Sequence, residues 1–237
     1  MTRPEADSQR FVSMLPPLTL ARLKVCMSPA MEIVPTAGGL RIGDSRGLIF
    51  TSANAVAIAA ALTDRRDLPC FCVGARTTEI ATDAGWSATQ RGATAEALLQ
   101  SLIDAPPDGP LLHLHGVHTR GDIAKQLTAA GIPATGQVIY DQKLRSMSPE
   151  VVAVLQGDLP VIIPLFSPRS ACHFAQQYRA AAPVYLAALS PAVAAPLAHL
   201  KATALHVSEA PNSAALVDLI EKVVNQVCRV ESERGAQ

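Results

Sequence analysis

Residues 47–62 read GLIFTSANAVAIAAAL, and this stretch decides the fold class. An apolar run from Leu48 to Phe50 ends at the polar pair Thr51 and Ser52, and an alanine-rich segment of helical character follows. Apolar residues at consecutive positions suit a parallel strand that helices cover on both faces. The stretch therefore predicts one strand-turn-helix unit of an α/β protein with parallel sheets.

The same order of strand, turn and helix recurs along the chain. Further units are PCFCVGARTTEIATDAG at residues 69–85, PLLHLHGVHTRGDIAKQLTAAG at 110–131, PVIIPLFSPRSACHFAQQ at 160–177 and PVYLAALSPAVAAPLAHL at 183–200. The motif FTS at residues 50–52 matches FSP at 166–168. Each motif is followed by another apolar run with a turn residue at its end, Gly74 and Ser190 respectively. This self-similarity predicts two lobes of the same design.

The last unit of the repeat is circularly offset. The segment LHGVHTRGDIAKQLTAAGIPATGQVIYDQ at residues 114–142 pairs best with TRPEADSQRFVSMLPPLTLARLKVCMSPAMEI at residues 2–33, near the start of the chain. One lobe is then continuous, and the other is assembled from the two ends of the chain.

We expect the continuous lobe at residues 36–143 and the discontinuous lobe at residues 1–35 and 144–237. Each lobe is expected to be flavodoxin-like, with a parallel sheet flanked by helices. The chain crosses between the lobes near residues 32–35 and 138–143. Both crossings are rich in β-forming residues, and they predict a two-stranded β linker that can act as a hinge.

The composition excludes several classes of partner. Lys and Arg together number 20, as do Asp and Glu, so no bulk positive field attracts nucleic acid or an anionic membrane. No apolar run approaches the roughly 18 residues of a membrane span, and the N-terminus carries no secretory signal pattern. The five cysteines are scattered and odd in number, as expected of reduced thiols. These features predict a cytoplasmic protein.

Small polar residues and glycines occur where the expected strands end. In parallel α/β sheets, ligands bind beyond the carboxyl ends of the strands, where helix N-termini offer N–H groups and partial positive charge. Several termini facing one cleft can hold a multiply charged carboxylate ligand, at roughly 0.3 to 1 kcal/mol each. The alternative is that each Ser, Thr or Asn only caps its own helix. The candidate positions are Thr51, Ser52, Asn54, Ala75, Thr77, Thr78, Gly92 and Thr94 in one lobe and Ser167, Ser170, Ser190, Asn212 and Ser213 in the other.

Other constellations favour structural roles. His113 and His115 fall on one side of a strand and His118 lies just past its end. No carboxylate or thiol partner is near them in sequence, so we expect structural or solvent-facing histidines and no metal. Cys70 and Cys72 lack the spacer of redox or zinc pairs and are expected to be buried strand thiols. Phosphate-loop, GxGxxG and GxSxG motifs are missing from the sequence, which removes the main support for a nucleotide-binding protein or a serine hydrolase.

Tyr140 lies in the segment VIYDQ at the start of the second crossing and is one of three tyrosines. We expect it to project near the mouth of the cleft, where a phenol can hydrogen-bond or donate a proton. Its unperturbed pKa near ~10 suits a weak general acid better than a base. The alternative is a tyrosine that packs at the boundary between lobes.

A series of short motifs follows in a fixed order along nearly the whole chain. They are TRPE at residues 2–5, PxxEI at 29–33, FTSANAV at 50–56, VG at 73–74 with Thr77, Gly92 with Ala95 and Glu96, Gly116 before RG at 120–121, VIY at 138–140 and FSP at 166–168. Their joint order and spacing resemble those of the uroporphyrinogen-III synthase (HemD) family.

The resemblance implies a cofactor-free lyase of heme biosynthesis that takes hydroxymethylbilane, a linear tetrapyrrole rich in carboxylates. It closes the bilane to uroporphyrinogen III, with loss of water and inversion of ring D. The contribution of such an enzyme is mostly conformational: it assists departure of the hydroxyl, stabilises the cationic azafulvene and folds ring D toward a spiro intermediate. The sequence shows no obvious oligomer seam, so we expect a monomer, with at most transient contact with the bilane-forming enzyme.

The resemblance carries roles over to particular positions. Tyr140 matches the tyrosine that the family favours as proton donor to the leaving hydroxyl. Backbone amides at the strand ends hold the substrate carboxylates in the family. The substrate-binding positions expected here are Thr51, Ser52, Asn54, Thr77, Gly92, Thr94, Gly116, Ser167 and Ser190.

Two departures from the family pattern matter. The family places an apolar strand before its TRP motif, whereas Met1 directly precedes Thr2 here. We therefore expect the first strand of the discontinuous lobe to be short or missing, as it would be if the natural start lay upstream. In addition, Val193 stands where the family often has threonine, which weakens any role for the helix that follows Ser190.

Two other classes of protein remain open. One is a noncatalytic two-lobed binding protein for a carboxylated metabolite, such as a cytosolic sensor, because it would share the duplication and the helix termini. The other is a flavodoxin-like nucleotide binder. Formation of the type III isomer from the bilane separates the enzyme from both.

Overall fold

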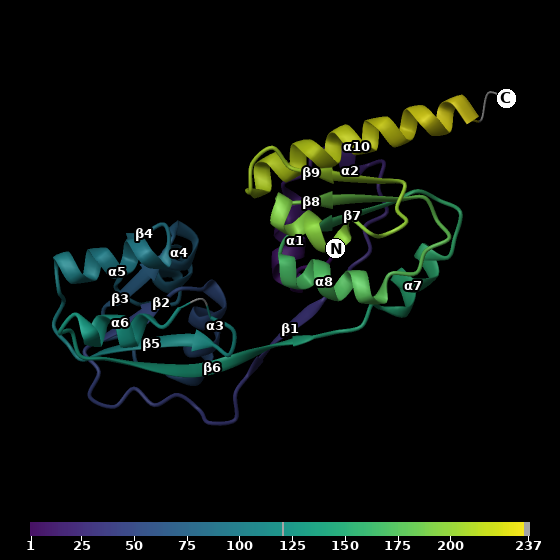
Figure 1. Cartoon of the computed structure of the whole chain (residues 1–237). Coiled ribbons are helices and arrows are strands. Elements are labelled where there is room, and N and C mark those ends of the chain that lie inside the picture. The colour runs from purple at the N-terminus through teal and green to yellow at the C-terminus, as the bar shows by residue number, and fades with distance from the viewer. Residues whose placement is uncertain (120, 235–237) are drawn as a thin grey trace. The chain divides into compact units, whose positions relative to one another are not determined.

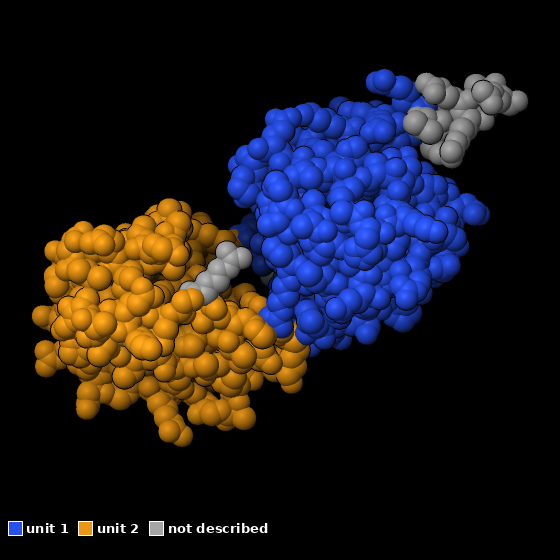
Figure 2. Space-filling view, viewed as in Figure 1, with its two compact units in different colours: residues 1–32, 144–237 blue, residues 33–143 orange. Residues whose placement is uncertain are grey.

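Parallel strands followed by helices make up most of the structure, a computed structural model that describes residues 1–119 and 121–234 (Figure 1). The chain divides into two units, coloured separately in Figure 2. Unit 1 consists of Met1–Glu32 and Leu144–Gln237, and unit 2 is Ile33–Lys143. In the described part of the chain, no helix combines the length and the apolar character needed to cross a membrane.

The larger sheet belongs mainly to unit 2 and has the strand order β1-β6-β5-β2-β3-β4. Its strands are β1 (Met31–Pro35), β2 (Gly47–Phe50), β3 (Cys70–Val73), β4 (Ala88–Gly92), β5 (Leu111–Gly116) and β6 (Ala134–Leu144). The helices are α3 (Ala53–Leu62), α4 (Ala75–Asp83), α5 (Ala95–Asp104) and α6 (Ile123–Ala129). The strands from β6 to β4 pair in parallel throughout. The prediction of parallel sheets is therefore confirmed.

The strand β2 is buried at every position because helices cover both faces of the sheet. On one face, Leu48 and Phe50 pack with residues of α3 and α4. On the other, Ile49 packs with Leu98 of α5 and Leu127 of α6. The consecutive apolar run thus has the environment that the sequence predicted for it. Cys70 and Cys72 in the neighbouring strand are fully buried, as expected.

Unit 1 contains a smaller parallel sheet of order β7-β8-β9. The strands are β7 (Val161–Leu165), β8 (Val184–Ala188) and β9 (Ala204–Val207). The helical elements are α1 (Glu5–Ser13), α2 (Pro17–Leu20), α7 (Pro149–Leu155), α8 (Pro168–Gln177), α9 (Pro191–Ala194), the 3₁₀ turn η1 (Ala195–Leu197) and α10 (Ser213–Arg234). Leu186 in β8 packs toward Phe174 of α8, whereas Ala187 packs toward Phe11 of α1 and Ile220 of α10. Helices therefore cover both faces here too.

The two crossings of the chain are neighbouring strands, because β1 lies beside β6 in the larger sheet. Thr36 N donates to Ile139 O at 3.0 Å, and Arg145 N donates to Ala30 O at 3.0 Å. As the residue number rises from 30 to 36 on one strand, the number of its partner falls from 145 to 139, which is the pattern of an antiparallel pair. The predicted two-stranded β linker is confirmed.

Candidate functional site

The carboxyl end of β2 leads straight into the first turn of α3 in unit 2. Ser52 is the N-cap residue of this helix: its backbone is extended, and its Oγ accepts a hydrogen bond from the backbone N–H of Asn54 at 3.2 Å. Capping is therefore part of the role of Ser52, as the alternative interpretation held. Ser52 and Asn54 are half-buried, so the cap does not close them off from solvent.

Thr51, the residue before the cap, is held by a histidine of the adjacent strand. Its Oγ1 lies 3.2 Å from Nε2 of His113 in β5, within hydrogen-bonding distance. His113 is only 3% exposed. Burial lowers its pKa to about 4, with a further contribution from the nearby His115, so the ring is neutral at physiological pH. His113 thus has a structural role at this strand end, as expected.

Tyr140 comes from β6 and reaches the same group of residues. Burial raises the pKa of the phenol, and the nearby side chain of Ser52 partly offsets this rise. The phenol is therefore protonated at neutral pH and available as a hydrogen-bond or proton donor.

The environment of Tyr140 differs from the open position that the sequence suggested. The residue is 4% exposed and belongs to the core of unit 2, as does Ile139 beside it. The cause is a register shift in the β5–β6 pair, where His115 is opposite Val138 but Gly116 is opposite Tyr140. An extra residue in one strand re-aims side chains in this way. The sequence pattern alone did not reveal this irregularity.

Gly116 makes room for the tyrosine ring. A Cβ at this position would lie 2.6 Å from both Cε2 and Cζ of Tyr140, closer than real Cβ contacts come. The glycine therefore has a steric reason to be there that is independent of any contact with substrate. Gly116 and Tyr140, both expected in the site, lie in direct contact with each other.

The candidate positions at β4 and α5 also have local structural roles. A Cβ on Gly92 would lie 2.5 Å from the backbone N of Leu98, so glycine lets the strand end approach α5 closely. Thr94 caps α5, with its Oγ1 accepting from Ala97 N at 3.2 Å, and is exposed. Thr77 is 7% exposed within α4. Of these three, Thr94 is the one that solvent reaches freely.

In unit 1, two serines follow strand ends in the same manner. Ser167 caps α8: its Oγ accepts from Ser170 N at 3.2 Å and lies 2.8 Å from Ser170 Oγ. Ser190 precedes the short helix α9 and makes no side-chain capping bond. Both serines are half-buried. They repeat the strand-end position that Ser52 has in unit 2.

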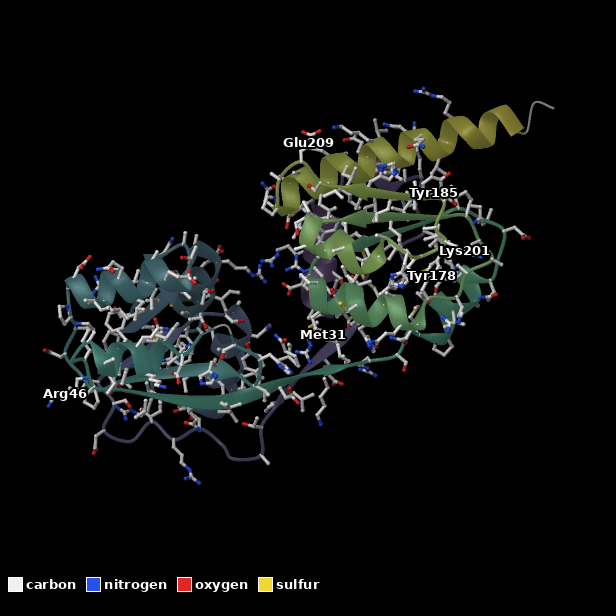
Figure 3. The ribbon with its side chains drawn as sticks, viewed as in Figure 1. Met31, Arg46, Tyr178, Tyr185, Lys201 and Glu209 are labelled. Atoms are coloured by element: carbon white, nitrogen blue, oxygen red, sulfur yellow. The ribbon has the colours of Figure 1, made fainter. Side chains whose placement is uncertain are left out.

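Unit 1 also has a cavity of ≈ 640 Å³ at the opposite end of its sheet. It is lined by residues that precede the strands, including Pro160, Pro183 and Thr203, together with Tyr185 and Lys201 (labelled in Figure 3). The Tyr178 hydroxyl donates to the Lys201 carbonyl beside it at 3.0 Å. Ligands of parallel α/β sheets bind at the carboxyl ends instead, so this cavity is not part of the candidate site.

The described histidines and cysteines form no cluster that could hold a metal ion. Within residues 1–119 and 121–234, no group of three or more His, Cys, Asp or Glu side chains is arranged to hold a metal ion. His113 and His115 stack with ring centroids 4.8 Å apart, and His118 lies 3.9 Å from Asp141 on an exposed surface. The chemistry that the described residues offer is hydrogen bonding, proton donation and attraction of anions to helix N-termini.

The fold and the strand-end groups define a class of protein: a two-domain α/β protein with parallel sheets and polar helix N-termini at the carboxyl ends of its strands. Comparison with known proteins places it further. A model of the family described as uroporphyrinogen-III synthase HemD matches residues 18–218. The chain belongs to the uroporphyrinogen-III synthase family, and it is an enzyme of that type. A search of curated proteins found no match.

One solved structure agrees on the fold. The uroporphyrinogen-III synthetase of Helicobacter pylori matches with a TM-score of 0.64 and 15% identity, covering 85% of this chain and 95% of that one. The wild-type uroporphyrinogen III synthase of the extremely thermophilic bacterium Thermus thermophilus matches with a TM-score of 0.38 and 14% identity, covering 84% and 87%. A mutant of the same Thermus protein matches with a TM-score of 0.39 and 13% identity, covering 84% of this chain and 88% of that one.

Proposed function

We propose that the protein is a uroporphyrinogen-III synthase, which closes hydroxymethylbilane to uroporphyrinogen III with loss of water and inversion of ring D in heme biosynthesis. The observation that carries this proposal is the family match over residues 18–218, which includes parts of both units. The protein would be a lyase that needs no cofactor. It would work as a cytoplasmic monomer with a small tetrapyrrole as its partner and with only transient contact with the bilane-forming enzyme.

We assign the proton donation to Tyr140. The burial that raises the pKa of its phenol keeps the proton in place at neutral pH, which a general acid requires before it acts. The side chain of Ser52, at the carboxyl end of β2, partly offsets the raised pKa of this phenol and so lies near it. A leaving hydroxyl of the bilane that accepts a hydrogen bond from Tyr140 receives this proton and departs as water.

The substrate carboxylates are assigned to the strand ends. Helix N-termini present N–H groups and partial positive charge, and α3, α5 and α8 begin at the polar caps Ser52, Thr94 and Ser167. Thr51, Asn54, Thr77, Gly92, Gly116 and Ser190 complete the proposed binding set. This arrangement suits a chain with no net charge, because the attraction is local to each helix terminus.

The catalytic contribution is positional. Once the hydroxyl leaves, the azafulvene carries positive charge, and the enzyme's task is to hold ring D in the geometry that leads to the spiro intermediate. The proposal therefore asks for no nucleophile and no acid-base triad. It requires the phenol, the strand-end donors and the exclusion of the competing closure.

An isomer assay tests the proposed function. Porphobilinogen and a bilane-forming enzyme supply the substrate with and without this protein, and the oxidised products are separated into isomers I and III. We expect isomer III to dominate when the protein is present and isomer I when it is omitted. Isomer I alone in both reactions would sink the enzymatic assignment and leave the noncatalytic binding protein.

A further inference from the structure

The cavity at the amino end of the small sheet has no role in the proposed reaction. Three segments surround it, and each leads into a strand: Pro160 before β7, residues 180–183 before β8 and residues 201–203 before β9. Its volume of ≈ 640 Å³ falls within the range of small-molecule sites. Ser167 and Ser190 of the candidate site follow the strands instead, so the two sites lie at opposite ends of the sheet.

The two units have equivalent loops at this end of their sheets. In unit 2, Leu48 N donates to Pro69 O at 2.9 Å just before β3. In unit 1, Val161 N donates in the same way to Pro183 O at 2.8 Å just before β8. The two prolines are therefore equivalent in the repeat. The three residues before the proline read RDL in unit 2 and AAA in unit 1.

Arg66, the first residue of the RDL sequence, fills this corner in unit 2. Its Cζ lies 4.2 Å from the centroid of the Trp86 ring. Its guanidinium donates to three backbone carbonyls at 2.6 to 3.2 Å. Ala180 stands at the equivalent position in unit 1. The loop of unit 1 thus has no side chain of this size, and the cavity lies beside it.

Tyr185 brings a free hydroxyl to the cavity. It is the second residue of β8 and is only 6% exposed, although its hydroxyl is not among the atoms that are cut off from solvent. That hydroxyl has no hydrogen-bond partner among the described residues. The hydroxyl of Tyr178 at the same corner differs, because it donates to the Lys201 carbonyl at 3.0 Å. The Tyr185 hydroxyl is therefore available to donate to a ligand.

Lys201 supplies a positive charge at the rim of the cavity. Its backbone is held in place, since its carbonyl accepts from Tyr178 and the neighbouring Ala202 N donates to Leu200 O at 2.9 Å. Its side chain is exposed and forms no ion pair with a described residue. Aspartate and glutamate are missing from the described lining of the cavity. The charge there is consequently positive and uncompensated.

The walls between these two polar groups are mostly apolar. Pro160 and Pro183 lie on the side of β7 and β8, and the alanines at residues 180–182 and 202 complete the surface. An inorganic anion would leave this surface without a partner, whereas an apolar body buries it. The single cation matches a single negative charge.

We propose that this cavity binds a small organic anion that has an apolar body and one carboxylate. The carboxylate accepts a hydrogen bond from the Tyr185 hydroxyl and pairs with the Lys201 ammonium. The apolar body packs against Pro160 and Pro183. Binding here is separate from the proposed catalytic role and needs no bilane, so the two can fail independently.

Benzoate is the probe, titrated into the full-length protein at constant ionic strength and followed by two-dimensional ¹H–¹⁵N NMR. We expect saturable shifts confined to the amides of residues 180–185 and 201–203, with a Kd of about 1 mM. Benzamide has the same shape without the charge, and acetate has the charge without the ring. Each should bind about tenfold more weakly.

The comparison of probes can overturn the proposal in two ways. Benzamide that binds as tightly as benzoate would reduce the cavity to an apolar crevice. Acetate or inorganic phosphate that binds as tightly as benzoate would show a site for any anion, without a role for the apolar walls. Shifts that do not saturate at about 20 mM benzoate, or that spread beyond the cavity, would reject the site.

Two substitutions in the cavity test the assigned contacts. Tyr185→Phe keeps the ring and removes the hydroxyl, so benzoate should bind about tenfold more weakly. Lys201→Gln should weaken binding about threefold, as expected of an exposed ion pair. Lys125→Gln changes an exposed lysine of unit 2 and should bind as wild type. The same spectra show whether each variant is folded, and wild-type affinity in both folded cavity variants would contradict the proposal.

Discussion

The ring of Tyr140 lies directly against the backbone of Gly116. A Cβ on the glycine would lie 2.6 Å from the ring carbons Cε2 and Cζ and 3.0 Å from the hydroxyl oxygen. The register shift between His115 and Gly116 brings this pair opposite each other. The position of the phenol relative to Ser52 therefore depends on the absence of a side chain at residue 116.

Gly116→Ala should move the tyrosine ring and slow turnover. A methyl group cannot fit without displacing the ring, and overpacking of this kind costs typically about 1 to 3 kcal/mol of stability. Gly38→Ala is the matched control, because nothing lies within 4 Å of a Cβ there. Isomer III formation and thermal unfolding are measured for both variants. Wild-type turnover in Gly116→Ala would mean that the ring position is unimportant for the reaction.

Tyr140→Phe keeps the ring and removes the hydroxyl. If the phenol is the proton donor, kcat should fall by about a hundredfold, whereas the affinity for uroporphyrinogen III should change little. Equal losses in turnover and product binding would point to positioning of the substrate instead. Tyr178→Phe serves as the control, since it also removes a buried tyrosine hydroxyl that has a hydrogen-bond partner, the Lys201 carbonyl. The control should retain full turnover.

The sequence predicted the strand ends well because their signals are local. An apolar run followed by a small polar residue specifies both a buried strand and the cap of the next helix, as at Ser52 and Ser167. Thr94 also caps its helix, although the strand before it is polar. Parallel pairing followed from runs without alternation, as in β2. These features depend on a few neighbouring residues and on nothing farther away.

The environment of Tyr140 could not be predicted in the same way. Its burial depends on an irregular register between β5 and β6, and pairing register is set by contacts between strands distant in sequence. The bond between Thr51 and His113 spans 62 positions and is likewise nonlocal. A histidine within an apolar strand was the available signal, but its partner could not be identified without the strand order.

His113 should make unit 2 less stable in mild acid. Its pKa in the folded protein is about 4, below the unfolded value of 6.5. The contribution of neutral His113 to the free energy of unfolding is therefore fully present above pH 6.5. It is lost as the pH falls toward 4, because the unfolded chain gains a proton that the folded one does not. Between pH 7 and pH 5 the loss should be about 2 kcal/mol.

Urea unfolding at the two pH values measures this loss, followed by the fluorescence of Trp86. It is the single tryptophan and is buried in unit 2. His113→Gln removes the titrating group but can still hydrogen-bond Thr51. This variant should therefore lose little of the roughly 2 kcal/mol of stability that the wild type loses between pH 7 and pH 5. His199→Gln, which changes an exposed histidine of unit 1, should behave as wild type. Identical pH dependence in all three proteins would contradict the assignment.

Buried strand thiols should resist alkylation. Burial raises the pKa of Cys72 to about 11, and the nearby side chain of Thr78 offsets only part of this rise. Burial also raises the pKa of Cys70 strongly. Because the thiolate is the reactive form, iodoacetamide near pH 8 should modify the exposed Cys172 long before either of them. Peptide mass spectrometry measures the order in which the thiols are alkylated. Comparable alkylation rates for Cys72 and Cys172 in the folded protein would contradict the burial of Cys72.

Thr94 offers a way to separate a helix cap from a carboxylate-binding position. It caps α5 through its side chain and is exposed. Asn and Asp cap helices about equally well, so Thr94→Asn and Thr94→Asp should both fold with near wild-type stability. They differ by one negative charge at the helix N-terminus.

If the N-terminus of α5 binds a substrate carboxylate, the carboxylate introduced by Thr94→Asp repels it. The introduced carboxylate also competes with the substrate for the partial positive charge of the helix N-terminus. KM for the bilane should then be about five- to tenfold higher for Thr94→Asp than for Thr94→Asn, a like-charge cost of about 1 kcal/mol near a protein surface. The difference should shrink as salt is added, because exposed charges are screened. Equal KM values for the two variants at low salt would show that Thr94 is a cap alone, and the carboxylates would then have to bind at the remaining strand ends.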